Sequence, residues 1–465
     1  MLRESLINFQ KPVKLNKLVK LNFLSALIIA LIAISCEPNN SQSNEKSDNE
    51  FQFSKAELIP IDSIKIDLQR ELSFYDYYEP SGLFLAGDVA DAFTAWMPPG
   101  GPKAINQIGH QIINREGQII SSFNNANDGP EGFGRGALSS FFIDEKRLGV
   151  LSLKGLYIYD FAGNLLDKIA NLNYLNVIGF STHKVAAFNL RDSVLAIALP
   201  KLDSTSFGNI DKAFENSTAL SFIDVNKLGQ DFNDVENLGR EFIDVEMATI
   251  SSYGFPEYFV YNSNFRFIKV QKPPMLAHNR SENELLVLYP EVPKLYSYDM
   301  LDGSFLDSID LNPSYFKTQE ELKVPDEEYV DWWNGGGMMA NSYFRQIIQL
   351  KNYTLIRYTT AIPENKIKEM IPEGGIRQSP NWPIIRKSEF KNIYQIYLDG
   401  KKLVKDFEIP LLELKEIHKD FFSSKEMHGQ ILGGNGLDEI FIYQPNDGEV
   451  ERDYELIIVY KLELR

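Results

Sequence analysis

Apolar and polar positions alternate in short runs along most of this chain, and the runs come in pairs around a tight turn. The clearest pair is GLYIYDFAGNLLDKI, residues 155–169, where apolar positions lie on both sides of Ala162-Gly163-Asn164. Alternation over about 4–8 residues is typical of a half-buried strand. Glycine and asparagine readily adopt the positive φ that a tight turn between strands requires. The segment therefore predicts a β-hairpin.

The same hairpin pattern recurs at three other places in the chain. Each copy has an apolar strand, a turn glycine and a second apolar run, and the copies are residues 109–123, 293–309 and 391–407. A hairpin cannot bury both of its faces alone, so repeated hairpins must pack against one another. The copies lie roughly 45 residues apart, or about twice that, which is within the range of blade lengths in β-propellers.

We therefore expect an all-β chain folded as a β-propeller of about seven four-stranded blades, with six or eight as alternatives. Other strand-like runs are expected to supply the inner strands of the blades: residues 139–153, 185–199, 285–289, 344–358 and 429–443. A solenoid would also stack hairpins, but short, aromatic-rich strands separated by turns favour the propeller.

The two ends of the folded region are expected to pair with each other. Residues 56–68 alternate as a half-buried strand should, and residues 454–464 are also strand-like. Propellers remove their exposed strand edges by closing the ring. We therefore expect these N- and C-terminal strands to lie side by side and to close the propeller.

The beginning of the chain has the features of a secretory signal. Lys14, Lys17 and Lys20 precede an apolar run, residues 23–34, that is too short for a membrane-spanning helix. The run ends in Ala33-Ile34-Ser35-Cys36, which resembles the lipobox of bacterial lipoproteins. The resemblance implies that the sulfur of Cys36 receives diacylglycerol and that the chain is cleaved before it. The alternative is a cysteine without this role.

These features predict three parts of the chain. Residues 1–35 are expected to be a lipoprotein signal peptide, residues 36–52 a flexible lipidated tether, and residues 53–465 a single β-propeller domain. The tether is predicted because its polar residues cannot bury enough apolar surface to fold. The expected location is the cell envelope, with the lipid in the outer membrane and the propeller facing the periplasm or the cell surface.

Charge excludes one class of partner. The chain has a formal net charge of −17, and residues 1–35 are its most basic part. Nucleic acids and anionic lipid surfaces are bound mainly through Lys and Arg side chains. We therefore expect no nucleic acid partner, and we expect the lipid on Cys36, rather than charge, to hold the protein at the membrane.

Two long insertions are candidates for ligand recognition. Residues 312–341 contain Trp332, Trp333 and Asn334, and residues 363–382 contain Arg377 and Trp382. Long loops on a rigid scaffold frequently carry binding residues, and tryptophan is enriched where partners bind. The alternative is that the indoles pack onto the blade beneath them.

Catalytic motifs are scarce. None of the five histidines has the spacing of a zinc hydrolase, and no Gly-x-Ser-x-Gly sequence is present. An axial site could still be assembled from residues that flank inner strands. The residues considered for it are His278 with Asn279 and Arg280, Arg345, Arg357, and His428 with Asn435 and Glu439. For each of them a structural role is the alternative. No cofactor is expected, except that the excess of carboxylates leaves Ca²⁺ open.

The glycine-rich stretch GPEGFGRG, residues 129–136, is interpreted as a connection between blades. A phosphate loop is disfavoured because its Gly-Lys-Ser/Thr ending is missing. The stretch resembles, in altered order, the Gly-Pro-Gly-Glu-Phe linker of TolB-like six-bladed propellers. Together with the lipobox and the Tyr-Asp hairpins, it gives the chain a resemblance to the Bacteroidota lipoproteins catalogued as domain of unknown function 4221.

The resemblance implies a lipid-anchored propeller outside the cytoplasm and carries no catalytic residues. Two function classes remain open. The first is a binding or scaffold module for a protein, peptide or glycan. The second is a hydrolase or lyase with an axial, Ca²⁺-assisted site.

Overall fold

The computed structural model describes a large part of the chain, with gaps. The described residues are 51–67, 72–88, 109–127, 129–134, 137–152, 155–170, 186–189, 194–198, 218–224, 249–254, 274–280, 282–317, 337–350, 353–370, 391–408, 430–435, 439–444 and 453–465. The chain divides into two units, Met1–Glu50 and Phe51–Arg465, and all described residues belong to the second. Within these residues, no helix has both the length and the apolar character needed to cross a membrane.

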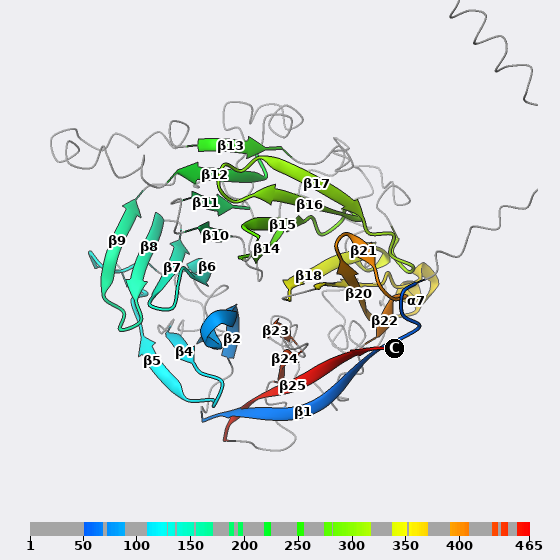
Figure 1. The fold of residues 1–465 in the computed structure, drawn as a ribbon, viewed down its shortest axis with the longest axis horizontal. Helices are drawn as coiled ribbons and strands as arrows, with labels where there is room; N and C mark the ends of the chain where they lie inside the picture. The colour runs from blue at the N-terminus through cyan, green and yellow to red at the C-terminus, as the bar shows by residue number, and fades with distance from the viewer. Residues whose placement is uncertain are drawn as a thin grey trace, which may run out of the picture. The chain divides into compact units, whose positions relative to one another are not determined.

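The second unit is built from six antiparallel sheets arranged in a ring (Figure 1). From the inner to the outer strand, the first sheet consists of β2 (Leu72–Tyr78), β3 (Leu83–Asp88), β4 (His110–Ile113) and β5 (Ile119–Phe123), and the second of β6 (Ala137–Phe142), β7 (Arg147–Ser152), β8 (Gly155–Asp160) and β9 (Leu165–Ala170). The third consists of β10 (Ala186–Asn189), β11 (Val194–Ile197), β12 (Leu220–Asp224) and β13 (Thr249–Tyr253), and the fourth of β14 (Met275–Asn279), β15 (Glu284–Leu288), β16 (Lys294–Asp299) and β17 (Phe305–Asp310). The fifth consists of β18 (Tyr343–Gln349), β19 (Thr354–Thr359), β20 (Asn392–Leu398), β21 (Lys401–Lys402) and β22 (Phe407–Glu408), and the sixth of β23 (Gln430–Gly434), β24 (Glu439–Gln444), β25 (Glu455–Leu464) and β1 (Ala56–Ile66). The numbering follows the order of the sheets around the ring.

The first strand of each sheet lies toward the middle of the ring. Each of these inner strands contacts the inner strand of the next sheet, and β23 of the sixth sheet contacts β2 of the first. In the fifth sheet the outer edge is formed by two short strands, since β21 and β22 both pair with β20. The described helices are short: η1 (Glu79–Ser81), η6 (Gly337–Ala340) and α7 (Glu364–Met370). The fold is therefore an all-β propeller.

The described residues form six blades, so the expected number of about seven is wrong and the alternative of six is the one observed. The third sheet alone draws its strands from residues 186–253, because long connections separate β11 from β12 and β12 from β13. Residues 285–289 were also misassigned to an inner strand. They correspond to β15, the second strand of the fourth sheet, and β14 is the inner one.

The four predicted hairpins are confirmed. They form the third and fourth strands of their sheets, and their turn glycines all have positive φ: Gly117 78°, Gly163 83°, Gly303 68° and Gly400 74°. The interpretation of GPEGFGRG is also confirmed, since residues 129–134 lie between β5 of the first sheet and β6 of the second. Phe133 from this connection is 1% exposed and packs between those two sheets.

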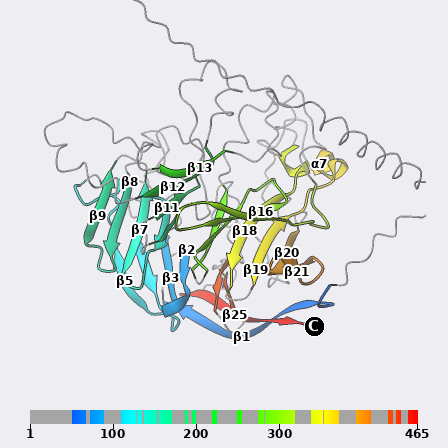
Figure 2. The ribbon, with the colours of Figure 1, turned by 45° about the horizontal axis from the view of Figure 1, so that its top comes forward.

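The predicted pairing of the first and last strands is present in the sixth sheet. β1 pairs antiparallel with β25, from Ala56 opposite Leu464 to Ile66 opposite Glu455. The two strands lie side by side in both views (Figure 1, Figure 2). The carbonyl of Arg465 accepts hydrogen bonds from the backbone N–H of Ser54 (2.6 Å) and of Lys55 (2.9 Å). The outer strand of this sheet thus comes from the N-terminal end of the folded unit, whereas its other three strands come from the C-terminal end.

The hydrophobic core is divided among the spaces between neighbouring sheets. Buried clusters lie between the first and second, third and fourth, fourth and fifth, fifth and sixth, and sixth and first sheets. The cluster between the fourth and fifth sheets, for example, includes Met275, Phe344 and Tyr358. The first, fourth, fifth and sixth sheets therefore bury both faces against their neighbours, which is why a lone hairpin of this sequence would have no stable fold.

Candidate functional site

The inner strands all run in the same direction. Near one end, the backbone N–H of Phe344, at the start of β18, donates to the carbonyl of Pro290, beside the start of β14 (2.7 Å). At the other end, the N–H of Phe142 in β6 donates to the carboxylate of Asp76 in β2 (2.9 Å). We call the side on which inner strands begin the entry face, and the side on which they end the exit face.

The direction of the inner strands determines the face of the propeller at which each long connection is attached. In an antiparallel sheet, the connection from the second to the third strand and the connection from the outer strand to the next sheet both join strand ends on the entry face. These include the connections 89–109, 171–185, 198–219, 254–274, 311–342, 360–391 and 409–429. The connection between β12 and β13, residues 225–248, joins strand ends on the exit face. Most of the sequence available for recognition is thus attached at the entry face.

On the exit face, Arg280 ties three inner strands together. Its guanidinium donates from Nη2 to the carbonyl of Phe142 (2.8 Å) and from Nη1 to that of Ile143 (3.2 Å). It also lies 4.9 Å from the ring centroid of Tyr78. Arg280 follows β14 of the fourth sheet, whereas Phe142 ends β6 of the second and Tyr78 ends β2 of the first. Because the first and fourth sheets are opposite in a ring of six, these contacts cross its axis.

On the entry side of the fifth sheet, two of the residues considered for an axial site lie together. Arg345 is in β18 and Arg357 is in β19, and Arg357 is paired with Gln346. The charge of Arg357 acts on Arg345 and helps to lower its pKa, which burial lowers to about 10. Arg345 donates from Nε to Oγ1 of Thr359 (3.2 Å), and its guanidinium lies 5.3 Å from the ring centroid of Tyr343.

The two arginines lie on the face of the fifth sheet that packs against the sixth. Tyr394, directly opposite Arg357 in the β19–β20 pair, is buried in the core between those sheets. Burial raises the pKa of the Tyr394 hydroxyl, and the positive charge of Arg357 partly opposes the rise. A guanidinium pair next to a buried phenol is a cationic, hydrogen-bond-donating arrangement, suited to binding an anion.

His278 is not part of this cluster. It is half-buried on β14, two residues after Leu276, so the two side chains lie on the same face of the strand. Leu276 packs between the third and fourth sheets. The arginines lie on the far side of the fifth sheet. Asn279 donates to the Glu282 carboxylate (3.0 Å), a local contact at the end of β14. The structure therefore brings Arg345 and Arg357 together and keeps His278 apart from them.

The other predicted site residues lie outside the described residues. They are Cys36, Trp332, Trp333, Asn334, Arg377, Trp382 and His428. Among the residues that are described, no three His, Cys, Asp or Glu side chains are grouped in a way that could hold a metal ion.

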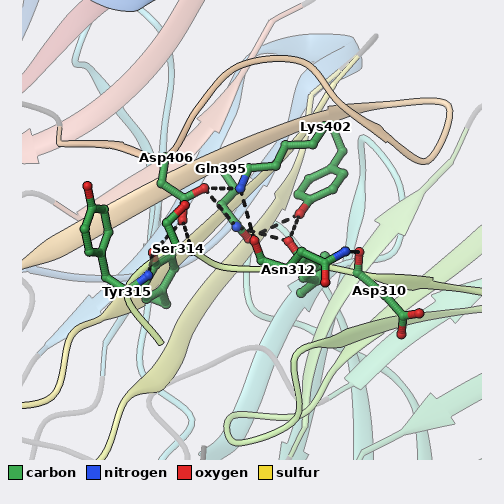
Figure 3. A network of polar contacts seen from close by, with 10 residues as sticks. Asp310, Asn312, Ser314, Tyr315, Gln395, Lys402 and Asp406 are labelled. Atoms are coloured by element: carbon green, nitrogen blue, oxygen red, sulfur yellow. Dashed lines mark hydrogen bonds and ion pairs between the residues drawn. The ribbon is translucent and has the colours of Figure 1, made fainter. Parts of the chain in front are cut away.

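Sequence reasoning missed a buried polar network at the base of the 312–341 insertion (Figure 3). At its centre, the Asp406 side chain is only 1% exposed and forms an ion pair with Lys402. The Asp406 carboxylate also accepts hydrogen bonds from the Ser314 backbone N–H (2.8 Å), the Tyr358 hydroxyl (2.6 Å) and the Gln395 amide (3.1 Å). Lys402 donates in addition to the Asn312 carbonyl (3.3 Å).

The network fixes both ends of the insertion. Asn312 and Ser314 begin it, and the Lys317 N–H donates to the hydroxyl of Ser342, just after it (2.9 Å). The ion pair can be kept in the interior because every partner also makes hydrogen bonds. Nothing in KKLVKDF, residues 401–407, distinguishes these two charges from exposed ones, so only the packing reveals them.

Neither a family model nor a curated protein matches the sequence. Among solved structures, a member of the duf4221 family from Bacteroides vulgatus matches over 89% of this chain and 99% of its own, with a TM-score of 0.50 and 11% identity. This is the family that the sequence resembles, and the match is consistent with that resemblance. At this identity the likeness shows the shared fold.

Two further matches have lower scores. A candidate exported protein from Bacteroides fragilis matches over 88% of this chain and 95% of its own, with a TM-score of 0.45 and 9% identity. The β-propeller domain of Cps50 from Myceliophteria thermophila matches over 88% of this chain and 99% of its own, with a TM-score of 0.37 and 10% identity.

Proposed function

We propose that this protein is a lipid-anchored propeller of the cell envelope that binds a protein, peptide or glycan through its entry face. The observation that carries the proposal is the buried network around Asp406, which fixes both ends of the insertion that contains Trp332 and Trp333. A recognition loop binds with less loss of entropy when a rigid scaffold holds its ends.

Binding is tested by removing the two indoles. The double variant Trp332→Ala, Trp333→Ala is screened with the wild type against envelope glycans and peptides from envelope proteins. We expect the ligand found with the wild type to bind the variant at least tenfold more weakly, because buried tryptophans dominate many interfaces. Phe305→Ala is the matched control, since Phe305 is an aromatic residue that is 50% exposed on an outer strand. Equal binding by the double variant and the wild type would contradict the proposal.

Anchoring rests on Cys36 and the sequence before it. The proposed organisation is a signal peptide at residues 1–35, a tether at 36–52 and a propeller at 53–465, located at the outer membrane. Cells that express the protein are labelled with radioactive palmitate. We expect label on the wild type and none on Cys36→Ser, with the variant recovered in the soluble fraction. Label on Cys36→Ser would show that Cys36 is not the attachment point.

Ring closure by the terminal strands is also proposed. β1 supplies the outer strand of the sixth sheet, and its residues Ile64 and Ile66 pack into the core between the sixth and first sheets. Deleting residues 56–66 should lower the melting temperature of the whole propeller, because the edge of β25 and this core become exposed. Deleting 39–49, a segment of equal length before the propeller, is the control. An unchanged melting temperature in the first deletion would refute closure.

The alternative function is a hydrolase or lyase with an axial, Ca²⁺-assisted site. The observation in its favour is the close pair of arginines on the entry side of the fifth sheet, which could stabilise negative charge in a transition state. Elemental analysis of the purified protein, combined with thermal unfolding in Ca²⁺ and in EDTA, separates the two functions. A stoichiometric metal whose removal lowers the melting temperature would favour the enzyme; no metal and no shift would favour the binding module.

A further inference from the structure

We propose that Arg345 and Arg357 form a binding site for a single oxyanion group of a ligand, a carboxylate, sulfate or phosphate, on the side of the fifth sheet that faces the sixth. The inference rests on the proposed binding function and specifies its chemistry, because the cluster lies toward the entry face.

The backbone gives Arg345 an unusual position. The pairing of β18 with β19 shifts between Phe344 and Gln346, so Arg345 has no partner residue on β19. A bulge of this kind turns a side chain away from the regular alternation of the strand, and bulges are common next to functional sites. The guanidinium is then held by Thr359 through Nε and by the ring of Tyr343. No hydrogen bond joins its two terminal nitrogens to a described residue.

Arg357 also has unused donors. It is half-buried, and its Nε is inaccessible to solvent without a hydrogen-bond partner among the described residues. The buried hydroxyl of Tyr394 lies beside Arg357, which acts on it through its charge and a hydrogen bond. Buried polar groups are nearly always hydrogen-bonded, so the unsatisfied Nε–H of Arg357 indicates an absent acceptor.

Charge points the same way. Three other described arginines have carboxylate partners: Arg115 pairs with Glu439, Arg147 with Asp144, and Arg465 with Glu57 and Glu463. Arg280 instead donates to two backbone carbonyls. Neither Arg345 nor Arg357 pairs with a described carboxylate, although the chain has 64 acidic residues against 47 basic ones.

Two neighbouring cations in a partly desolvated position repel each other, and an anion between them removes that cost. Burial lowers the pKa of Arg345 to about 10, and the positive charge of Arg357 adds to that lowering. Guanidinium groups donate in a planar fork that matches the oxygens of carboxylates, sulfates and phosphates.

The test is calorimetric titration of the full chain, purified in a neutral detergent, with inorganic phosphate, sulfate and acetate at constant ionic strength. We expect saturable binding of one anion per chain, with the tightest of the three identifying the ligand group. Arg345→Gln and Arg357→Gln should each weaken this binding at least tenfold. Arg147→Gln is the control, because Arg147 lies in the second sheet and already pairs with the carboxylate of Asp144. Absence of saturable binding in the wild type, or equal binding in the two glutamine variants, would overturn the proposal.

Arg357→Lys keeps the charge but loses the fork, and it decides the case if a glutamine variant does not fold. We expect it to weaken binding at least threefold, and unchanged affinity would count against the site. The outcome is independent of the tryptophan test. Loss of anion binding only in the arginine variants, with ligand capture unaffected by the tryptophan change, would retain this site and reject the proposed binding surface.

Discussion

At the scale of single residues, the turn glycines explain why the hairpin repeat is recognisable. Each has positive φ, and most also lie against the preceding sheet. A Cβ on Gly163 of the second sheet would be 2.6 Å from Cβ of Phe123 in the first. A Cβ on Gly303 of the fourth sheet would be 2.6 Å from Cδ2 of Phe222 in the third. Glycine is thus required both by the turn and by the packing of blades.

This double requirement predicts a large effect of adding one methyl group. Gly163→Ala and Gly303→Ala should each destabilise the protein by about 2–4 kcal/mol, because backbone strain at positive φ adds to a clash in a packed interface. Gly109→Ala is the control. Its Cβ would meet only the Phe123 carbonyl oxygen at 3.7 Å, so we expect less than about 0.5 kcal/mol. Urea unfolding measures both, and equal stability of Gly163→Ala and Gly109→Ala would contradict the argument.

His110 is the residue that should make stability depend on pH. It is fully buried, its Nε2 is hydrogen-bonded to the Ser140 hydroxyl at 2.8 Å, and its ring stacks on Phe123. Burial lowers its pKa from 6.5 to about 4, so the folded state disfavours the proton that the unfolded chain accepts. Its stabilising contribution is complete above pH 6.5 and is lost as the pH falls toward 4.

The loss amounts to roughly 3 kcal/mol, at about 1.4 kcal/mol for each unit of pKa. Because part of the loss occurs only below pH 4.5, we expect the free energy of unfolding of the wild type to fall between pH 7 and pH 4.5 by about 2.4 kcal/mol more than in His110→Gln, which cannot titrate. Chemical denaturation at the two pH values measures the difference. Parallel losses in the two proteins would show that other groups cause the acid sensitivity.

At the scale of elements, the sequence predicts what is local and misses what depends on distant packing. The four hairpins are predicted because alternation and turn glycines lie within 15–17 residues. The number of blades was missed because the connections between strands have no period that reveals their length. Arg345 and Arg357 could be named from their places beside strands, whereas their proximity depends on the pairing of β18 with β19.

The Asp406–Lys402 pair is the clearest example of a feature that sequence reasoning cannot find. Asp406→Asn should cost about 3–5 kcal/mol, because it leaves the Lys402 ammonium buried without its counter-charge. Glu408→Gln in the same sheet is the matched control. Glu408 pairs with Lys391, but both side chains are more than half exposed, so we expect at most about 0.5 kcal/mol.

The same variant should affect the insertion before it affects the fold. With Ser314 and Asn312 no longer held as firmly, limited proteolysis should cut between residues 318 and 336 faster in Asp406→Asn than in Glu408→Gln, under conditions where both are folded. Equal cleavage rates in the two variants would show that the network around Asp406 does not hold the insertion in place.

At the scale of the whole propeller, the two faces differ in what the chain attaches to them. The exit face is tied across the axis by Arg280, whereas strand ends on the entry face are joined by the long connections. This asymmetry was not readable from the sequence, because Arg280 and its partners Phe142 and Tyr78 are far apart in the chain. It divides the propeller into one face tied across its axis and one face that carries most of the long connections.

The antiparallel pairing of β1 with β25 places the first and last residues of the propeller within one hydrogen bond of each other, from Lys55 N–H to the Arg465 carbonyl. The chain can therefore be circularly permuted: a short linker from residue 465 to residue 55, with new ends opened between β12 and β13, preserves every strand pair. Fusions at the C-terminus, by the same geometry, emerge beside the point where the N-terminal segment enters the propeller.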